Sequence, residues 1–64
     1  MSGTVVEAVR RELVAMERVG VIDSRTLGEA LRYLRDNEDE VAAWHANGMR
    51  VSEVADAVVE VARV

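Results

Sequence analysis

The chain is 64 residues long and carries twelve acidic residues against eight arginines, so its formal net charge is −4 at pH 7. It has no cysteine and one histidine, which excludes disulfides, thiol nucleophiles and a multi-histidine metal site within one chain. No apolar run approaches the roughly 18 residues of a membrane-spanning helix, and no signal-peptide pattern opens the sequence. We therefore expect a single soluble domain over residues 1–64, located in the cytoplasm.

Half of the residues are hydrophobic, which favours a folded domain over a disordered chain. A domain this short buries only about 60% of the surface of its unfolded chain. Because disulfides and metal sites are excluded, association with another chain is the remaining common source of stability. Arginine is the only basic residue type, and with the many Val and Ala it is typical of a GC-rich genome, such as that of an actinobacterium or phage.

The first helix is predicted over about residues 5–19. Thr4 and Glu7 have the spacing of a capping box, and Gly20 follows as the left-handed residue after the helix end. The apolar side chains recur at helical spacing and cover nearly half of the circumference, more than one neighbouring helix normally covers. The face consists of Val5, Val6, Val9, Leu13 and Met16, extended sideways by Ala8, Ala15 and Val19.

A second helix is predicted to begin after Asp23, whose side chain can act as its N-cap. The apolar phase continues through the acidic run 36–40, so we expect one long helix over about residues 24–47, bent near Asn37. The alternative is a break at Asn37, because Asn and Asp are weak helix formers.

The pair Asn47-Gly48 predicts the end of this helix. In that geometry Met49 would pack back on Trp44, a contact between sulfur and an aromatic ring.

The last helix is predicted over about residues 52–63, with Ser52 as its cap. The β-branched segment 58–61 could instead be a strand, but its polar residues fall at helical spacing. The expected fold is therefore all-α, with three helices and a long central one. The wide apolar face of the first helix predicts assembly into a homodimer or a larger helical bundle.

No catalytic, cofactor-binding or metal-binding residues are expected. A calcium loop built on the acidic run 36–40 would need a glycine where Val41 stands, so these carboxylates fit a solvated face. No glycine-rich loop joins a strand to a helix, which excludes a phosphate cradle. The serines at 2, 24 and 52 are accounted for by the terminus or by capping, and no nucleophile–base pair remains.

Aromatic and imidazole side chains mark the candidate binding surface. Tyr33 and Trp44 lie three helical turns apart, where they either cover the edge of the core or anchor a partner. His45 is either a hydrogen-bonded histidine at the core edge or a pH-sensitive contact across an oligomer interface. The predicted partner-binding residues are Tyr33, Val41, Trp44, His45 and Met49.

These features favour a small non-enzymatic protein–protein interaction module, such as a regulatory, inhibitory or assembly factor. We expect it to bind copies of itself and another protein through an apolar helical face. Membranes and small-molecule substrates are not expected as partners. Nucleic acid is disfavoured as a partner, because residues 36–64 hold seven acids against two arginines.

The alternative function is a dimeric nucleic-acid-binding regulator. Arg11 with Arg18, and Arg25 with Arg32, repeat at seven residues and could follow a phosphate backbone. More often such residues pair with nearby acids on the same helix.

Two segments resemble nucleic-acid-binding families. Residues 48–58 resemble the turn and second helix of resolvase-type helix-turn-helix domains, although Val59 stands where the next glycine of that family would be. Residues 29–35 and 54–59 resemble the last helices of ANTAR domains, which are three-helix RNA-binding modules. The spacing is longer here, and Arg50 alone replaces their basic residues. The resemblances imply at most a truncated element, and neither family is assigned.

Overall fold

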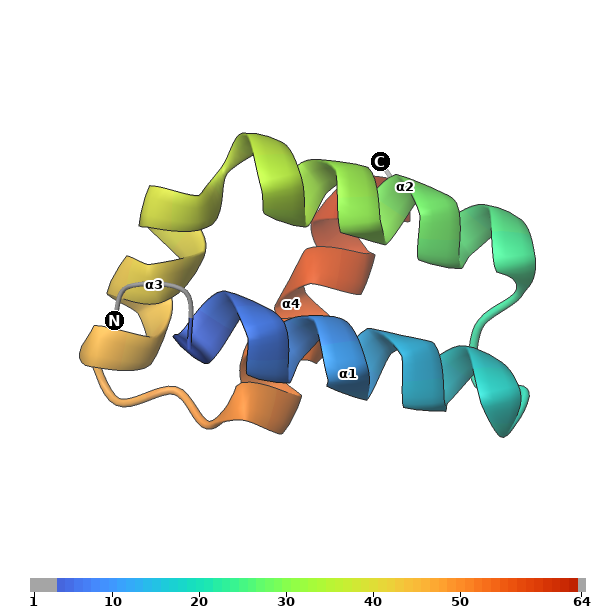
Figure 1. Cartoon of the computed structure of the whole chain (residues 1–64), viewed down its shortest axis with the longest axis horizontal. Helices are drawn as coiled ribbons and strands as arrows, with labels where there is room; N and C mark the ends of the chain where they lie inside the picture. The colour runs from blue at the N-terminus through green and yellow to red at the C-terminus, as the bar shows by residue number, and fades with distance from the viewer. Residues whose placement is uncertain (1–3, 64) are drawn as a thin grey trace.

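The computed structural model describes residues 4–63, which form four helices and no strand. They are α1 (Thr4–Arg18), α2 (Ser24–Asp36), α3 (Glu38–Ala46) and α4 (Val51–Arg63). The helices α1 and α2 lie side by side as an antiparallel hairpin, α4 crosses behind them, and α3 closes one end (Figure 1). The all-α prediction is confirmed. None of these helices combines the length and apolarity needed to cross a bilayer.

The prediction of three helices with a long central one is wrong, because the chain breaks at Asn37. This residue has φ −133° and ψ 40°, and α3 begins at the next residue. The Asn37 side-chain amide donates to the Tyr33 carbonyl at 3.0 Å, a local bond that competes with continued helix. A straight helix over residues 24–47 would be about 36 Å long, whereas the longest extent of the molecule is 28 Å. The break keeps α3 within the fold.

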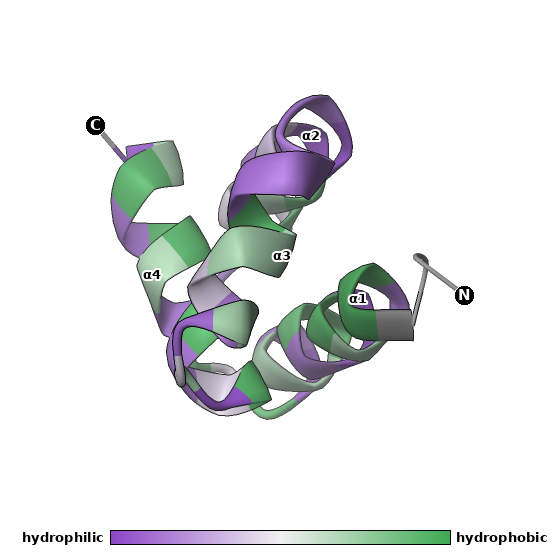
Figure 2. Ribbon diagram, turned by 90° about the vertical axis from the view of Figure 1, so that its left-hand side faces the viewer, coloured by the Kyte–Doolittle hydropathy of each residue, from purple (hydrophilic) through white to green (hydrophobic). Residues whose placement is uncertain are grey.

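All four helices contribute to one hydrophobic core, and Figure 2 shows their apolar sides directed toward the middle of the molecule. The helix α1 contacts α2, α3 and α4, which explains why its apolar face is so wide. The fully or nearly fully buried side chains are Val6, Val9, Leu13, Ile22, Ala30, Leu34, Val41, Val54, Ala55, Val58 and Val59.

The accessible surface of the chain is close to that of a self-contained monomer. It measures 4391 Å², and a monomer of 7.1 kDa exposes about 4100 Å². In the apolar face that predicted the homodimer, Val6, Val9 and Leu13 are buried and Val5 and Met16 pack against the core. The large apolar side chains that stay exposed within the described residues are Val19, Val21 and Val61. The homodimer or larger bundle stays a prediction.

Two glycines end helices, as predicted. Gly20 and Gly48 have φ values of 85° and 107°, in the left-handed region that favours glycine. Each helix end carries the two backbone bonds of a Schellman motif. After α1, Val21 N–H donates to Met16 O and Gly20 N–H to Glu17 O; after α3, Met49 N–H donates to Trp44 O and Gly48 N–H to His45 O.

The predicted cap of α2 is confirmed. An Asp23 carboxylate oxygen accepts from the Thr26 backbone N–H at 2.7 Å. This bond lowers the pKa of the Asp23 carboxyl below its ordinary value of 3.8, because it stabilises the charged form.

The helix α4 begins earlier than predicted. It starts at Val51, and the Arg50 backbone N–H donates to the Glu53 carboxylate at 2.8 Å. Arg50 therefore takes the capping position, and the predicted Ser52 cap is wrong. The helix continues to Arg63, so the segment 58–61 is not a strand. The predicted capping box at the start of α1 depends on the side chain of Thr4, which lies outside the described part of the chain.

We expect Gly20→Ala and Gly48→Ala each to lower the free energy of unfolding by about 1–2 kcal/mol, because alanine is strained at these φ values. Urea denaturation followed by circular dichroism measures the change. A loss below about 0.3 kcal/mol at both positions would contradict the left-handed helix ends.

Candidate functional site

The two aromatic residues of the predicted binding surface meet at the corner between α2 and α3. The Tyr33 and Trp44 rings stack with centroids 6.4 Å apart and an interplanar angle of 18°. Both are partly buried against the core, and the Tyr33 hydroxyl donates to the Glu40 carboxylate. The two rings therefore pack against each other beside the turn at Asn37, and much of their surface contacts the rest of the chain.

The other predicted binding residues do not form one exposed surface with this pair. Val41 is fully buried in the core and is not accessible to a partner. Met49 is partly buried against the core. His45 is exposed, and its Nδ1 lies 3.0 Å from the Met49 carbonyl oxygen, so it is a hydrogen-bonded histidine outside the core.

The hydrogen bond to Glu40 raises the pKa of the Tyr33 hydroxyl above its ordinary value of 10.0. Desolvation and the negative charge of Glu40 act in the same direction. The bond needs the neutral phenol as its donor, so its contribution to stability is present below pH 10 and is lost as the pH rises through the raised pKa.

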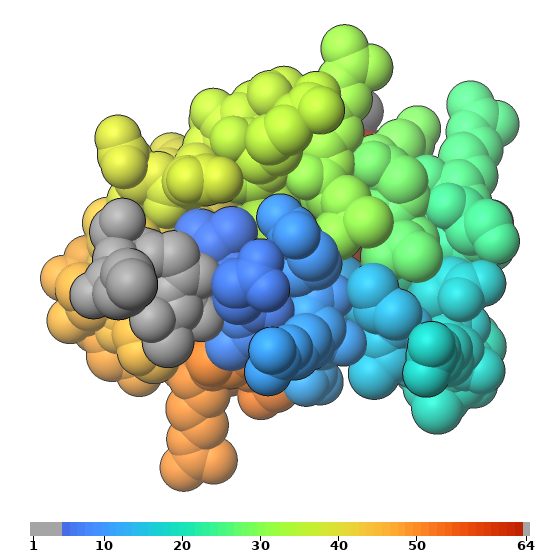
Figure 3. Space-filling model, in the orientation of Figure 1, coloured from blue at the N-terminus to red at the C-terminus, as the bar shows by residue number. Residues whose placement is uncertain are grey.

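A different surface gathers most of the arginines. Two adjoining hollows share Arg10 and cover the outer side of α1 and its boundary with α2. Figure 3 shows this side of the molecule, where α1 and α2 lie next to each other across the surface. We call it the basic groove; it is lined by Arg10, Arg11, Val14, Ala15 and Arg18 of α1 and by Gly28, Leu31, Arg32 and Arg35 of α2.

The basic groove keeps positive charge that the molecule does not neutralise. Arg10 lies 3.2 Å from Glu7, and Arg35 lies 3.6 Å from the adjacent Asp36. Within residues 4–63, no carboxylate lies at ion-pair distance from the other three arginines of the groove, which are Arg11, Arg18 and Arg32. We call the arginines of α1 and those of α2 the two rims of the groove.

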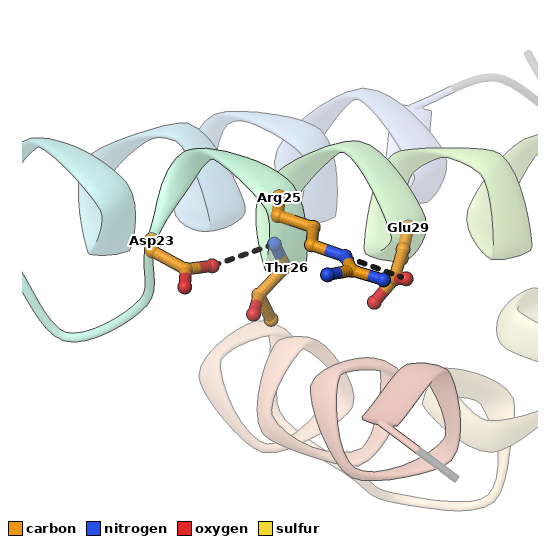
Figure 4. Close-up of polar contacts among 4 residues, drawn as sticks. All are labelled: Asp23, Arg25, Thr26 and Glu29. Carbon is orange, nitrogen blue, oxygen red and sulfur yellow. Dashed lines mark hydrogen bonds and ion pairs between the residues drawn. The ribbon is translucent and has the colours of Figure 1, made fainter.

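Arg25 of α2 lies outside the groove. Its guanidinium points along α2 to Glu29, at 3.8 Å, beside the Asp23 cap (Figure 4). The six acids of α3 and α4 are all exposed on elements that do not line the groove. The helices α1 and α2 also carry five acids, but none of these lines the groove, so its lining is basic on a chain of net charge −4.

Gly28 lies in the floor of the basic groove, near the middle of α2. Its backbone is helical, and a Cβ added there would meet no atom of the chain within 4 Å. No internal packing therefore requires a glycine, although glycine in a helix interior is about 1 kcal/mol less favourable than alanine.

The sequence carries a signal for this surface beyond the seven-residue repeats of Arg11 with Arg18 and Arg25 with Arg32. Gly28, Arg32 and Arg35 follow each other at spacings of four and three residues, so they share one face of α2. Arg11 and Arg18 share a face of α1 with the small apolar residues between them. Only the hairpin brings the two faces together.

Within residues 4–63, no three carboxylate or imidazole side chains gather closely enough to hold a metal ion. No protein-family model, curated protein or solved structure matches the chain. The surface groups of the chain are therefore the basis for inferring its function.

We expect the ultraviolet absorbance of Tyr33, the only tyrosine, to titrate at higher pH than that of free tyrosine. Glu40→Gln should return the pKa toward 10.0, whereas Glu7→Gln, which removes the same charge from α1, should leave it raised. Equal titration curves for the two variants would contradict the bond between Tyr33 and Glu40.

We expect Gly28→Ala to raise the free energy of unfolding by about 0.5–1 kcal/mol, opposite in sign to the same change at Gly20 and Gly48. Urea denaturation of the three variants under one set of conditions measures the contrast. A loss of stability at position 28 would show that the chain itself needs this glycine.

Proposed function

We propose that this chain is a small non-enzymatic protein-interaction module, and that the basic groove is where it binds a protein partner. The observation that carries the proposal is that five arginines from α1 and α2 gather around the small and aliphatic residues of the groove, which we call its floor. The floor consists of Val14, Ala15, Gly28 and Leu31, and Gly28 adds no side chain there. Arginine is enriched at the residues that contribute most to binding between proteins. A regulatory, inhibitory or assembly role is consistent with a chain of this size, as is additional self-association.

The composition of the groove favours protein over nucleic acid. Half-buried Val14 and Leu31 lie among the arginines, and apolar side chains of a partner can cover them, whereas phosphates cannot. No aromatic side chain lines the groove for base stacking. The acids of α3 and α4 also oppose a long polyanion. The rival function, a nucleic-acid-binding regulator, is supported by the same unpaired arginines.

The positions of the possible catalytic groups support a non-enzymatic role. The Ser24 hydroxyl donates to Glu17 at 3.2 Å, at the α2 end that is remote from α3 (Figure 1). The only histidine, His45, lies on α3. A hydroxyl nucleophile needs a base within hydrogen-bond reach; His45 is too far away to serve Ser24, whose partner is the exposed carboxylate of Glu17.

Site-specific photocross-linking in the source organism tests the proposal. A photoreactive amino acid at position 11, in the groove, should give a discrete product that protease removes and nuclease does not. The same residue at position 63, at the end of α4, is the control and should not give that product. A nuclease-sensitive product at position 11 would support the nucleic-acid alternative instead. Identical products at both positions would contradict the groove as the binding surface.

A further inference from the structure

We infer that the occupant of the basic groove is a single acidic amphipathic α-helix of another protein, lying along the α1–α2 hairpin on the side opposite α4. The inference rests on the proposed function and specifies its partner by chemistry. Such a helix would place an apolar stripe on the floor of the groove and carboxylates against the arginines on its two rims.

The arginines on each rim repeat at helical spacing. Arg11 and Arg18 are seven residues apart on α1, or about 10.5 Å along the axis. Arg32 and Arg35 are three residues apart on α2, or about 4.5 Å. Glutamates spaced by seven and by three or four residues on a ligand helix have the same separations. A ligand helix can therefore place glutamates at the spacing of the arginines on α1 or on α2.

The floor of the groove permits close approach of a helix. Helix axes pack about 8–10 Å apart, and the side chains at the contact set the distance. Gly28 and Ala15 leave the surface low on each side of the groove, while Leu31 supplies apolar area between the arginines. Gly28 is exposed and adds no side chain, so the backbone of a ligand helix can lie against it.

The dimensions set the length of the ligand. The 15 residues of α1 and the 13 residues of α2 correspond to about 20–22 Å. A ligand helix of about 14 residues, or four turns, spans the hairpin.

A second copy of this chain is a poorer occupant. Its most acidic exposed helix face is on α4, with Glu53, Asp56 and Glu60. The apolar face of α4 is already buried in the core. A second copy would therefore offer carboxylates to the rims with little apolar surface for the floor, whereas a helix from another protein can offer both.

Fluorescence anisotropy with labelled synthetic peptides tests this inference. The probe is a 14-residue helical peptide (about four turns) with leucines at i, i+3, i+7 and i+10 and glutamates on both flanks. The control peptide has the same composition in a scrambled order, so its charge is equal but its apolar stripe is lost. We expect the patterned peptide to bind at least about tenfold more tightly than the scrambled one.

Three variants locate the binding. Arg32→Gln should weaken binding of the patterned peptide roughly three- to tenfold. Arg25→Gln, the same charge change one heptad earlier on α2 and outside the groove, should have little effect. Gly28→Gln fills the floor and should weaken binding roughly tenfold or more without lowering the melting temperature, so that misfolding cannot explain the loss.

The outcomes separate this inference from the proposed function. Equal binding of the two peptides would overturn the helical occupant, and a groove-specific protein cross-link would still support the proposed function. Absence of binding by either peptide would likewise overturn it. Tighter binding of a DNA or RNA duplex of equal charge, together with a nuclease-sensitive cross-link, would overturn both. A dimer in sedimentation that Gly28→Gln dissociates would identify a second copy as the occupant and overturn the inference.

Discussion

The turn at Asn37 determines how this short chain covers its apolar side chains. It ends α2 and lets α3 fold across the end of the hairpin, where Val41 joins the core. The stack of Tyr33 on Trp44 holds the two helices at this corner. Without the turn, α3 would extend beyond the other helices and expose one apolar face. The compact fold therefore depends on one residue that favours local hydrogen bonds over helix continuation.

Most large apolar side chains of the described residues are buried or pack against the core, although Val19, Val21 and Val61 are exposed. The outer side of the hairpin combines charged and apolar groups, because arginines there surround small and aliphatic side chains. Exposed ion pairs contribute little to stability, so the unpaired arginines are not explained by folding. They are explained if an acidic partner covers them, and a partner that also contributes apolar side chains would gain from the floor.

The glycines divide into two groups by physical role. Gly20 and Gly48 occupy left-handed positions that end α1 and α3, and the fold needs them. Gly28 has no such conformation and no neighbour that requires its small size. A residue that weakens a helix without serving its packing is a reasonable mark of function, and it lies where the arginines of the two helices meet.

The sequence by itself determined the helical class, the N-cap of α2 and the glycine ends of α1 and α3, because these features depend on neighbours within a few residues. The sequence did not decide whether the helix breaks at Asn37. The weak helix propensity of Asn37 favoured a break, whereas the helical spacing of the apolar residues favoured one long helix. That spacing gave the wrong prediction because it continues by chance into α3. Only the tertiary structure decided that Val41 belongs to the core and that His45 faces solvent. The basic groove likewise arises only when the hairpin sets Arg10 of α1 beside Arg32 of α2, residues 22 positions apart in the sequence. Helical spacing predicts which residues share a face of one helix, but the neighbour of that face is set by how the whole chain packs.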